Sequence, residues 1–78
     1  MSYTLYFRPG CPFCAKVLEV SEELGVEFVM KNIYDEGISE ELVARGGKAQ
    51  VPYFVDEEKN VEMYESDDII AYLREHVS

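Results

Sequence analysis

Apolar and polar residues recur along the first third of the chain at spacings that predict a strand followed by a helix. The aromatic and β-branched run Tyr3–Phe7 predicts a strand that ends at Arg8-Pro9-Gly10. Pro12 suits the first turn of a helix, and Gly25 is typical of the residue that ends one. Between these two residues the apolar positions keep helical spacing. The residues expected on the buried face of this helix are Cys14, Val17, Leu18, Ser21 and Leu24.

The middle of the chain predicts a second strand and a short second helix. Residues 27–33 are rich in apolar residues and predict the strand. A helix from Ser39 to Arg45 is expected next, with the Ser39 side chain as its N-terminal cap. The pair Gly46-Gly47 then ends the helical pattern.

The last third of the chain predicts a hairpin and a final helix. Two short apolar runs, 53–55 and 61–64, flank the polar segment 56–60, as in a β-hairpin. Ser66 is expected to cap the last helix, whose first turn carries two acidic residues. The apolar stripe of this helix is typical of core packing and consists of Ile69, Ile70, Leu73 and Val77.

These elements predict a single α/β domain over residues 1–78 with the order β-α-β-α-β-β-α. The first two strands and the helix between them are expected to form a right-handed βαβ unit, and the last two strands an antiparallel hairpin. The result is a four-stranded mixed sheet flanked by three helices. A chain of 78 residues is long enough for one domain and too short for two.

Composition narrows the range of partners. The formal net charge of −9 argues against nucleic acid or an anionic membrane as a partner. There is no apolar run of about 18 residues, the length that a membrane-spanning helix needs. No secretory signal is visible, because no basic segment followed by an apolar stretch stands at the N-terminus. Loss of such a signal, and origin of the chain as a fragment of a longer protein, both stay open.

The two cysteines, Cys11 and Cys14, are the main candidates for chemistry. A disulfide across two intervening residues closes so short a loop that it contributes little stability, which favours a redox role over a structural one. Cys11 immediately precedes a predicted helix, where unpaired N–H groups and the helix dipole stabilise a thiolate. We therefore expect an exposed, attacking Cys11 and a more buried, resolving Cys14. Lys16 either adds positive potential or is a solvated surface residue.

Cys-x-x-Cys pairs also bind zinc, which is a competing interpretation of the same motif. A structural zinc site needs four ligands, and this chain offers two thiols and His76. His76 is expected in the last turn of the final helix, where a polar or cationic side chain is favourable in any case. We therefore expect no metal site.

Three motifs together resemble the glutaredoxin family. They are the strand–Arg8-Pro9-Gly10-Cys11-Pro12-Phe13-Cys14–helix segment, Gln50-Val51-Pro52 before a strand, and Ser66-Asp67-Asp68 at the start of the last helix. The match covers nearly the whole chain in the same order. The segment from Val51 to Ser66 is also similar to the glutathione-binding N-terminal domain of glutathione transferases. Both families share the thioredoxin-like fold, which the resemblance therefore implies.

The resemblance implies three contacts with glutathione. A cis peptide bond before Pro52 would leave the backbone of Val51 free to pair with the cysteinyl part of the tripeptide. The N–H groups of Ser66 and Asp67 would bind the γ-glutamyl carboxylate, as expected of a helix N-terminus, and the Asp67 carboxylate would bind its ammonium. Glu65 could make similar contacts, as in the transferases. Simple capping is the alternative role of Ser66.

Further residues around the expected groove resemble those of the family. Arg8 and Lys48 occupy positions of basic residues that would bind the glycine carboxylate, with solvated surface residues as the alternative. Phe13 replaces a commoner tyrosine and keeps a ring beside the site. Gln50 stands where glutaredoxins usually carry threonine, and Tyr64-Glu65 replaces a usual glycine pair.

The resemblance implies an enzyme that uses glutathione to reduce protein disulfides or to remove glutathione from modified client proteins. A redox-active cysteine pair without a visible secretion signal favours a cytoplasmic location, and a monomer is the default expectation for a chain of this size. A second hypothesis keeps the dithiol chemistry but takes electrons from thioredoxin reductase or another low-molecular-weight thiol. A third is an iron–sulfur module that bridges two copies through Cys11 and glutathione. A fourth is a piece of a glutathione transferase, whose helical second domain does not fit into 78 residues.

Overall fold

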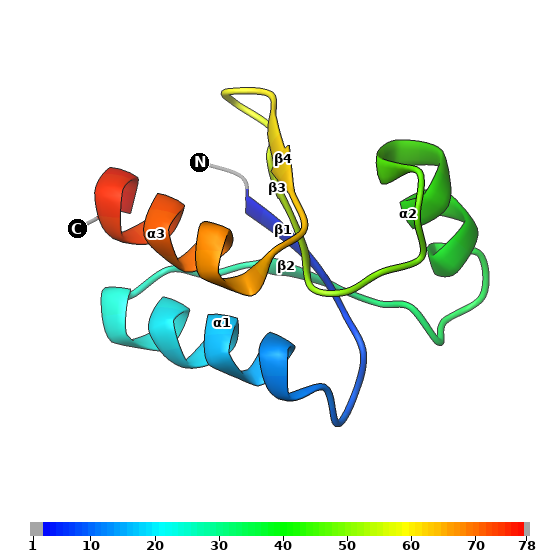
Figure 1. Cartoon of the computed structure of the whole chain (residues 1–78), viewed down its shortest axis with the longest axis horizontal. Helices are drawn as coiled ribbons and strands as arrows, with labels where there is room; N and C mark the ends of the chain where they lie inside the picture. Colours follow the sequence, from blue (N-terminus) through cyan, green and yellow to red (C-terminus); the bar gives the residue numbers. More distant parts are fainter. Residues whose placement is uncertain (1–2, 78) are drawn as a thin grey trace.

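The computed structural model of the chain describes residues 3–77, except the side chain of Val77, and contains seven elements in the predicted order (Figure 1). Met1, Ser2, Ser78 and the predicted core position of the Val77 side chain lie outside the described part. The elements are β1 (Tyr3–Phe7), α1 (Pro12–Leu24), β2 (Val29–Asn32), α2 (Ile38–Gly46), β3 (Tyr53–Asp56), β4 (Val61–Met63) and α3 (Ser66–Val77).

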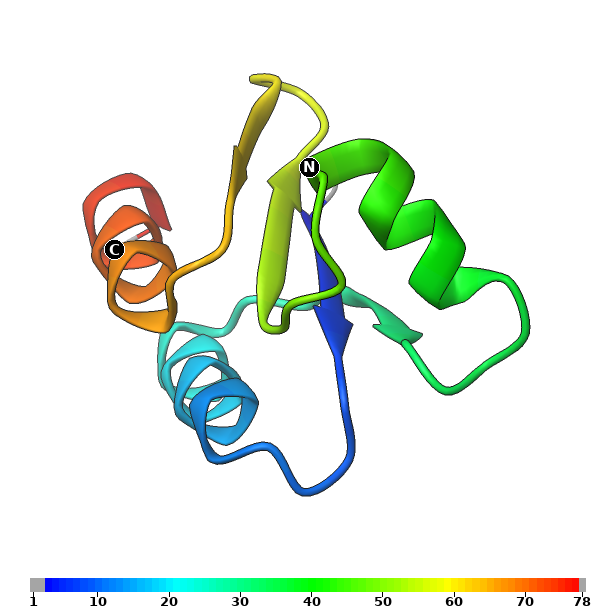
Figure 2. The same cartoon turned by 45° about the vertical axis from the view of Figure 1, so that its right-hand side comes forward.

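The four strands form one mixed sheet in the order β2-β1-β3-β4. β1 pairs in parallel with β2 and antiparallel with β3, which continues antiparallel to β4. Helices α1 and α3 lie side by side on one face of the sheet, and α2 covers the other face (Figures 1 and 2). The predicted mixed sheet with three flanking helices is therefore confirmed.

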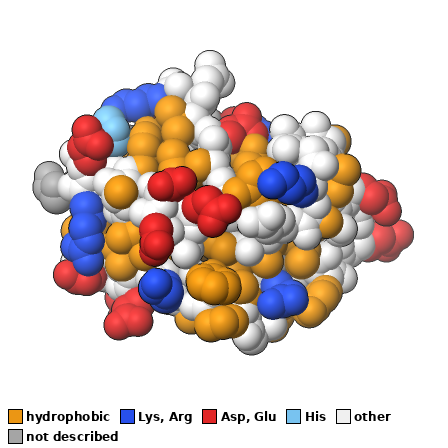
Figure 3. All heavy atoms as spheres, in the orientation of Figure 1, with side chains coloured by type: hydrophobic (Ala, Val, Ile, Leu, Met, Phe, Trp, Pro, Cys, Tyr) orange, Lys and Arg blue, Asp and Glu red, His pale blue; other side chains and the backbone are white. Residues whose placement is uncertain are grey.

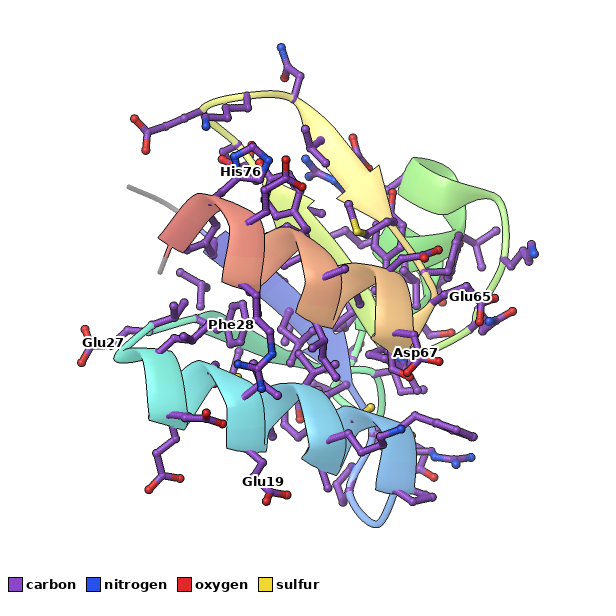
Figure 4. All side chains as sticks on the ribbon, turned by 60° about the vertical axis from the view of Figure 1, so that its left-hand side comes forward. Glu19, Glu27, Phe28, Glu65, Asp67 and His76 are labelled. Carbon is purple, nitrogen blue, oxygen red and sulfur yellow. The ribbon has the colours of Figure 1, made fainter. Side chains whose placement is uncertain are left out.

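Alternation of side chains along the two central strands produces the two helix-covered faces. Successive residues of a strand point to opposite sides. Leu5 and Phe54 accordingly belong to the core under α1 and α3, whereas Tyr6 and Tyr53 belong to the core under α2. Phe28, just before β2, packs against the first of these cores and lies between α1 and α3 in Figure 4. The first core contains Tyr3, Leu5, Val17, Phe54, Ile69 and Leu73, and the second Tyr6, Leu42, Tyr53 and Val55.

A buried carboxylate connects the β3–β4 hairpin to α3. Asp56 is 2% exposed, and its Oδ1 accepts hydrogen bonds from the N–H groups of Glu58 and Lys59 at 3.1 and 3.4 Å. Its Oδ2 accepts a hydrogen bond of 2.6 Å from the hydroxyl of Tyr72 in α3. A buried carboxylate needs such partners because its desolvation is costly. These hydrogen bonds fix the position of the β3–β4 turn relative to α3.

The second helix begins one residue earlier than predicted, and Ser39 is not its cap. Gly37 precedes the helix with φ of 83°, a left-handed conformation that glycine adopts without steric penalty, and no side chain caps this end. The other end is as expected, because Gly47 has φ of 91° and its N–H donates to the carbonyl of Val43. Ser39 therefore lies inside the first turn.

The predicted cap of α3 is displaced by one residue. The N–H of Ile69 donates to the carbonyl of Glu65 at 2.9 Å, so Glu65 holds the cap position and Ser66 is the first helical residue. The strands differ at their ends as well. β2 is shorter than the predicted 27–33, β3 extends to Asp56, and β4 ends at Met63.

None of the helices within residues 3–77 has the length and hydropathy that crossing a bilayer requires.

Removing the ring of Phe54 should cost a large part of the stability of the domain. Phe54 is fully buried, and its ring contacts those of Tyr3, Phe28 and Tyr72. We expect Phe54→Ala to lower the free energy of unfolding by about 3–5 kcal/mol, from a total of about 5–15 kcal/mol typical of such domains. Chemical denaturation measures the change.

The matched control is Phe13→Ala, since the Phe13 side chain is 57% exposed. Its expected effect on the free energy of unfolding is within about 0.5 kcal/mol. Equal losses in the two variants would contradict the core described above.

Candidate active site

The directions of the strands bring three segments of the chain to one edge of the sheet. Tyr6 near the end of β1 pairs with Tyr53 at the start of β3, so the chain leaves β1 and enters β3 at the same edge. Phe54 pairs with Met63, so β4 also ends there. The loop 8–11, the segment 47–52 and the connection 64–67 therefore lie close together.

Cys11 caps α1 with its own sulfur. The N–H of Cys14 donates to Cys11 Sγ at 3.4 Å, and the Cys11 carbonyl accepts the first helical hydrogen bond, from Ala15, at 3.1 Å. Gly10, with φ of 80°, turns the chain into this position, and the N–H of Cys11 donates to the carbonyl of Arg8 at 3.2 Å. Serine, threonine, aspartate and asparagine commonly cap helices with a side-chain oxygen. Here the same geometry directs the N–H of Cys14 to a sulfur.

This geometry shifts the pKa values of the two thiols in opposite directions. Burial by itself would raise the pKa of Cys11, but hydrogen bonds from Cys14, the Phe13 N–H and the Arg8 side chain outweigh burial and lower it. Burial first, and the neighbouring Cys11 sulfur second, raise the pKa of Cys14 to about 11, against the opposing effect of Arg8. A thiolate therefore forms on Cys11 first.

The expectation that Cys11 is exposed is wrong. Its relative exposure is 5%, against 2% for Cys14, so both thiols are buried. The reason is the capping contact, which turns the sulfur toward the first turn of α1 instead of toward solvent. Acidity, and not exposure, is what distinguishes the two cysteines in this structure.

A pocket of about 170 Å³ opens between the start of α1, the turn before β3 and the start of α3. Sites for drug-sized ligands commonly measure about 300–1,000 Å³, so this pocket has room for only part of a ligand of that size. Six predicted site residues line it, and the peptide bond before Pro52 is cis, as expected. The lining residues are Phe13, Gln50, Val51, Pro52, Tyr64, Glu65, Ser66 and Asp67.

The pocket combines an acidic rim with the positive end of a helix. Asp67 lies at the start of α3, beside the first turns of α1, and its carboxylate is 3.6 Å from Lys16 Nζ (Figure 4). Both side chains are largely exposed, so this ion pair is weak. In Figure 3 acidic side chains gather over the beginning of α3. The first N–H groups of the helix have no partner within it, and a carboxylate in the pocket could accept hydrogen bonds from them.

The two predicted cations do not line the pocket. Arg8 lies near the Cys11 thiol, whose pKa its side chain lowers. Lys48 is held by Tyr64, whose hydroxyl donates to the Lys48 carbonyl at 2.7 Å and accepts the Lys48 N–H at 3.1 Å. The Lys48 Nζ is 5.3 Å from the centre of the Tyr64 ring. Contact of either cation with a ligand carboxylate stays a prediction.

Sequence reasoning did not assign two of the lining residues, Gln50 and Tyr64. Both stood out only as departures from the glutaredoxin pattern. Each is next to a predicted site residue in the chain, and this adjacency was the available signal. Neither Cys11 nor Cys14 lines the pocket itself, but Phe13, which stands between them in the chain, does.

Among the described residues, no group of three or more His, Cys, Asp or Glu side chains is arranged to hold a metal ion. His76 is exposed near the end of α3, and its ring packs against that of Tyr72, with ring centres 4.3 Å apart.

Comparison with known proteins relates this fold and site to a family. The family model described as the glutathione S-transferase N-terminal domain matches residues 5–78. A search of curated proteins found no match.

Solved structures give the same relationship. A glutathione S-transferase from the Antarctic clam Laternula elliptica is 34% identical with a TM-score of 0.84, over 99% of this chain and 36% of that one. The glutathione transferase URE2P6 from Phanerochaete chrysosporium, in complex with oxidized glutathione, is 28% identical with a TM-score of 0.81, over 97% and 36%. Ure2p in complex with glutathione is 27% identical with a TM-score of 0.75, over 99% and 36%.

This chain thus spans 36% of the length of each of these three proteins. The comparisons bear out the similarity to transferases, whereas membership of the glutaredoxins in particular stays a prediction. With a family model that matches nearly its whole length, the chain belongs to the family of glutathione S-transferase N-terminal domains and has the thioredoxin-like fold expected from its sequence.

Proposed function

We propose that this chain is a glutathione-dependent thiol–disulfide oxidoreductase with Cys11 as nucleophile and Cys14 as resolving thiol. The observation that carries the proposal is the hydrogen bond from the Cys14 N–H to Cys11 Sγ at the start of α1. It lowers the pKa of Cys11 while Cys14 stays protonated, with a pKa of about 11. An acidic thiol followed one helical turn later by a protonated one is the arrangement that dithiol exchange requires.

The reaction proceeds in two exchanges. The Cys11 thiolate attacks one sulfur of a disulfide, forms a mixed disulfide with it and releases the other sulfur as a thiolate, which takes up a proton. Cys14 then loses its proton and attacks Cys11 Sγ, which releases the second thiol and leaves a Cys11–Cys14 disulfide. Two molecules of glutathione return this disulfide to two thiols and become oxidised glutathione.

The first exchange itself prepares Cys14 for the second. Burial is the larger cause of its high pKa and persists, but the neighbouring Cys11 sulfur also raises that pKa. When Cys11 enters a mixed disulfide, its negative charge disappears, and the pKa of Cys14 falls. Cys14 therefore gains nucleophilic character at the stage at which it must attack.

The pocket beside Phe13 fits the γ-glutamyl end of glutathione. Glu65 and Asp67 offer carboxylates to an ammonium group, and the start of α3 offers N–H groups to a carboxylate. Two of the similar structures are glutathione complexes, which supports the same ligand for this chain.

A coupled assay tests the proposal. Reduction of the glutathione–mercaptoethanol mixed disulfide is followed with glutathione, glutathione reductase and NADPH. We expect wild type and Cys14→Ser to turn over, since this substrate needs only the attacking thiol, and Cys11→Ser to lose at least about a hundredfold because it lacks the nucleophile.

Activity that survives in Cys11→Ser would contradict the assigned roles. If wild type turns over only when thioredoxin reductase or γ-glutamylcysteine replaces glutathione, the dithiol chemistry stands and glutathione is the wrong donor.

The acidity of the two thiols can be measured by their alkylation. Iodoacetamide reacts with thiolates, so the rate of each cysteine in the reduced protein rises with pH through its own pKa. We expect the midpoint for Cys11 below the usual value of about 8.5 and that for Cys14 near 11, with the modified sites identified by mass spectrometry. Arg8→Gln should move the Cys11 midpoint to higher pH, because it removes the guanidinium group that lowers the pKa of that thiol.

Arg74→Gln is the matched control, since Arg74 pairs with Glu23 on α1 at 3.5 Å. A Cys11 midpoint that responds equally to both substitutions would indicate a general charge effect and not a local effect of the Arg8 side chain.

Glutathione transfer is the second candidate function, and the family match over residues 5–78 favours it. Conjugation of glutathione to 1-chloro-2,4-dinitrobenzene measures it directly. Because this chain spans 36% of its transferase relatives, we expect conjugation to be absent or at least about a hundredfold slower than disulfide reduction. Conjugation that equals reduction in rate would make the transferase the better assignment.

A further inference from the structure

Tyr64 makes an unusual double contact with the backbone of a single residue. Its hydroxyl donates to the carbonyl of Lys48 and accepts the N–H of the same residue, at 2.7 and 3.1 Å. Lys48 lies 16 residues earlier in the chain, in the segment that runs from α2 to the pocket wall at Gln50 and Val51. One phenol oxygen therefore connects the β4–α3 connection to the α2–β3 connection.

The close approach of these segments requires a glycine. A Cβ atom on Gly46 would lie 2.2 Å from the Tyr64 hydroxyl oxygen and 2.8 Å from the ring carbon that bears it. The backbone of Gly46 does not have a left-handed conformation, so its lack of a side chain serves this contact. Gly46 thus provides the space in which the Tyr64 hydroxyl reaches Lys48.

The Tyr64 ring is itself held firmly. Its centre is 4.5 Å from that of the Tyr53 ring, which is buried and donates a hydrogen bond to Glu62. The same Tyr64 side chain lines the pocket. A side chain that is fixed on one side and bonded to a loop on the other can set the position of that loop.

We propose that the Tyr64 hydroxyl is a positioning group that fixes the segment 48–52 as a wall of the pocket and thereby sets the affinity for glutathione. The inference rests on the proposed function, because it takes the pocket as the glutathione site. Tyr64 takes no part in thiol exchange. Its contribution is preorganisation, which improves binding by removing the cost of ordering a loop when the ligand arrives.

Because Lys48 is exposed, loss of the Tyr64 hydroxyl should weaken ligand binding without lowering the stability of the domain. Lys48 is exposed, so water replaces the Tyr64 hydroxyl when that group is removed, and no buried polar group is left without a partner. The hydroxyl of Tyr72 differs, because its partner Asp56 is buried. The two tyrosines therefore form a matched pair of hydroxyls, one expected to affect binding and the other to affect stability.

The experiment compares Tyr64→Phe with Tyr72→Phe in the full chain. Binding of S-methylglutathione, which cannot react with Cys11, is measured by calorimetry, and unfolding by denaturant. We expect Tyr64→Phe to raise Kd by about fivefold to tenfold, equivalent to the loss of about one hydrogen bond, with a nearly unchanged midpoint of unfolding. Tyr72→Phe should lower the unfolding midpoint and leave Kd within about twofold of wild type.

Gly46→Ala provides an independent check on the same contact. It should also raise Kd, because the new methyl group displaces the Tyr64 hydroxyl. The increase should be smaller in the Tyr64→Phe background, where the nearest atom is missing. Effects of the two substitutions that simply add would show that they do not act through one contact, and would overturn the proposal.

The remaining outcomes distinguish the positioning role of Tyr64 from the assignment of the pocket to glutathione. If wild type binds S-methylglutathione and Tyr64→Phe binds it equally well, the positioning role is wrong and the proposed function is untouched. If wild type does not bind it, the glutathione site is misassigned, and the role of Tyr64 fails with it.

Discussion

The central antiparallel strands β1 and β3 bury side chains on both faces, and the positions of the three helices follow from this burial. Leu5 and Phe54 must be covered on one side of the sheet and Tyr6 and Tyr53 on the other. Helices α1 and α3 bury the first pair of side chains, and α2 buries the second. Because β1 and β3 run in opposite directions, the same pairing also brings their functional ends, before Cys11 and after Pro52, to one edge.

Much of this arrangement could be predicted from the sequence, because its signals are local. Helical spacing, Pro12 and Gly25 define α1 correctly, and the polar segment between two apolar runs defines the hairpin. The errors occur where local preferences compete. Ser39 is a good capping residue, but Gly37 turns the chain earlier, and Ser66 is displaced from the cap position by Glu65.

The sequence allowed most residues of the candidate site to be predicted, but not their burial or their contacts. Motif positions identified six of the lining residues, since each motif stands at the end of an element. The burial of Cys11 was not predictable, because it depends on the rotation of one sulfur toward a backbone N–H. The double contact of Tyr64 with Lys48 was hidden for a similar reason. It joins residues that are far apart in the chain, and it depends on the space that Gly46 leaves.

Capping of α1 by a sulfur has a thermodynamic consequence for the whole domain. Oxidation of Cys11 changes the acceptor that satisfies the first turn of the helix, so the oxidised and reduced forms differ in how well that turn is stabilised. By linkage, the difference in the free energy of unfolding between the oxidised and reduced forms equals the difference in the free energy of oxidation between the folded and unfolded chain. The reduction potential of the two cysteines would therefore depend partly on the stability of α1. Residues of this helix that lie away from both sulfurs could change it.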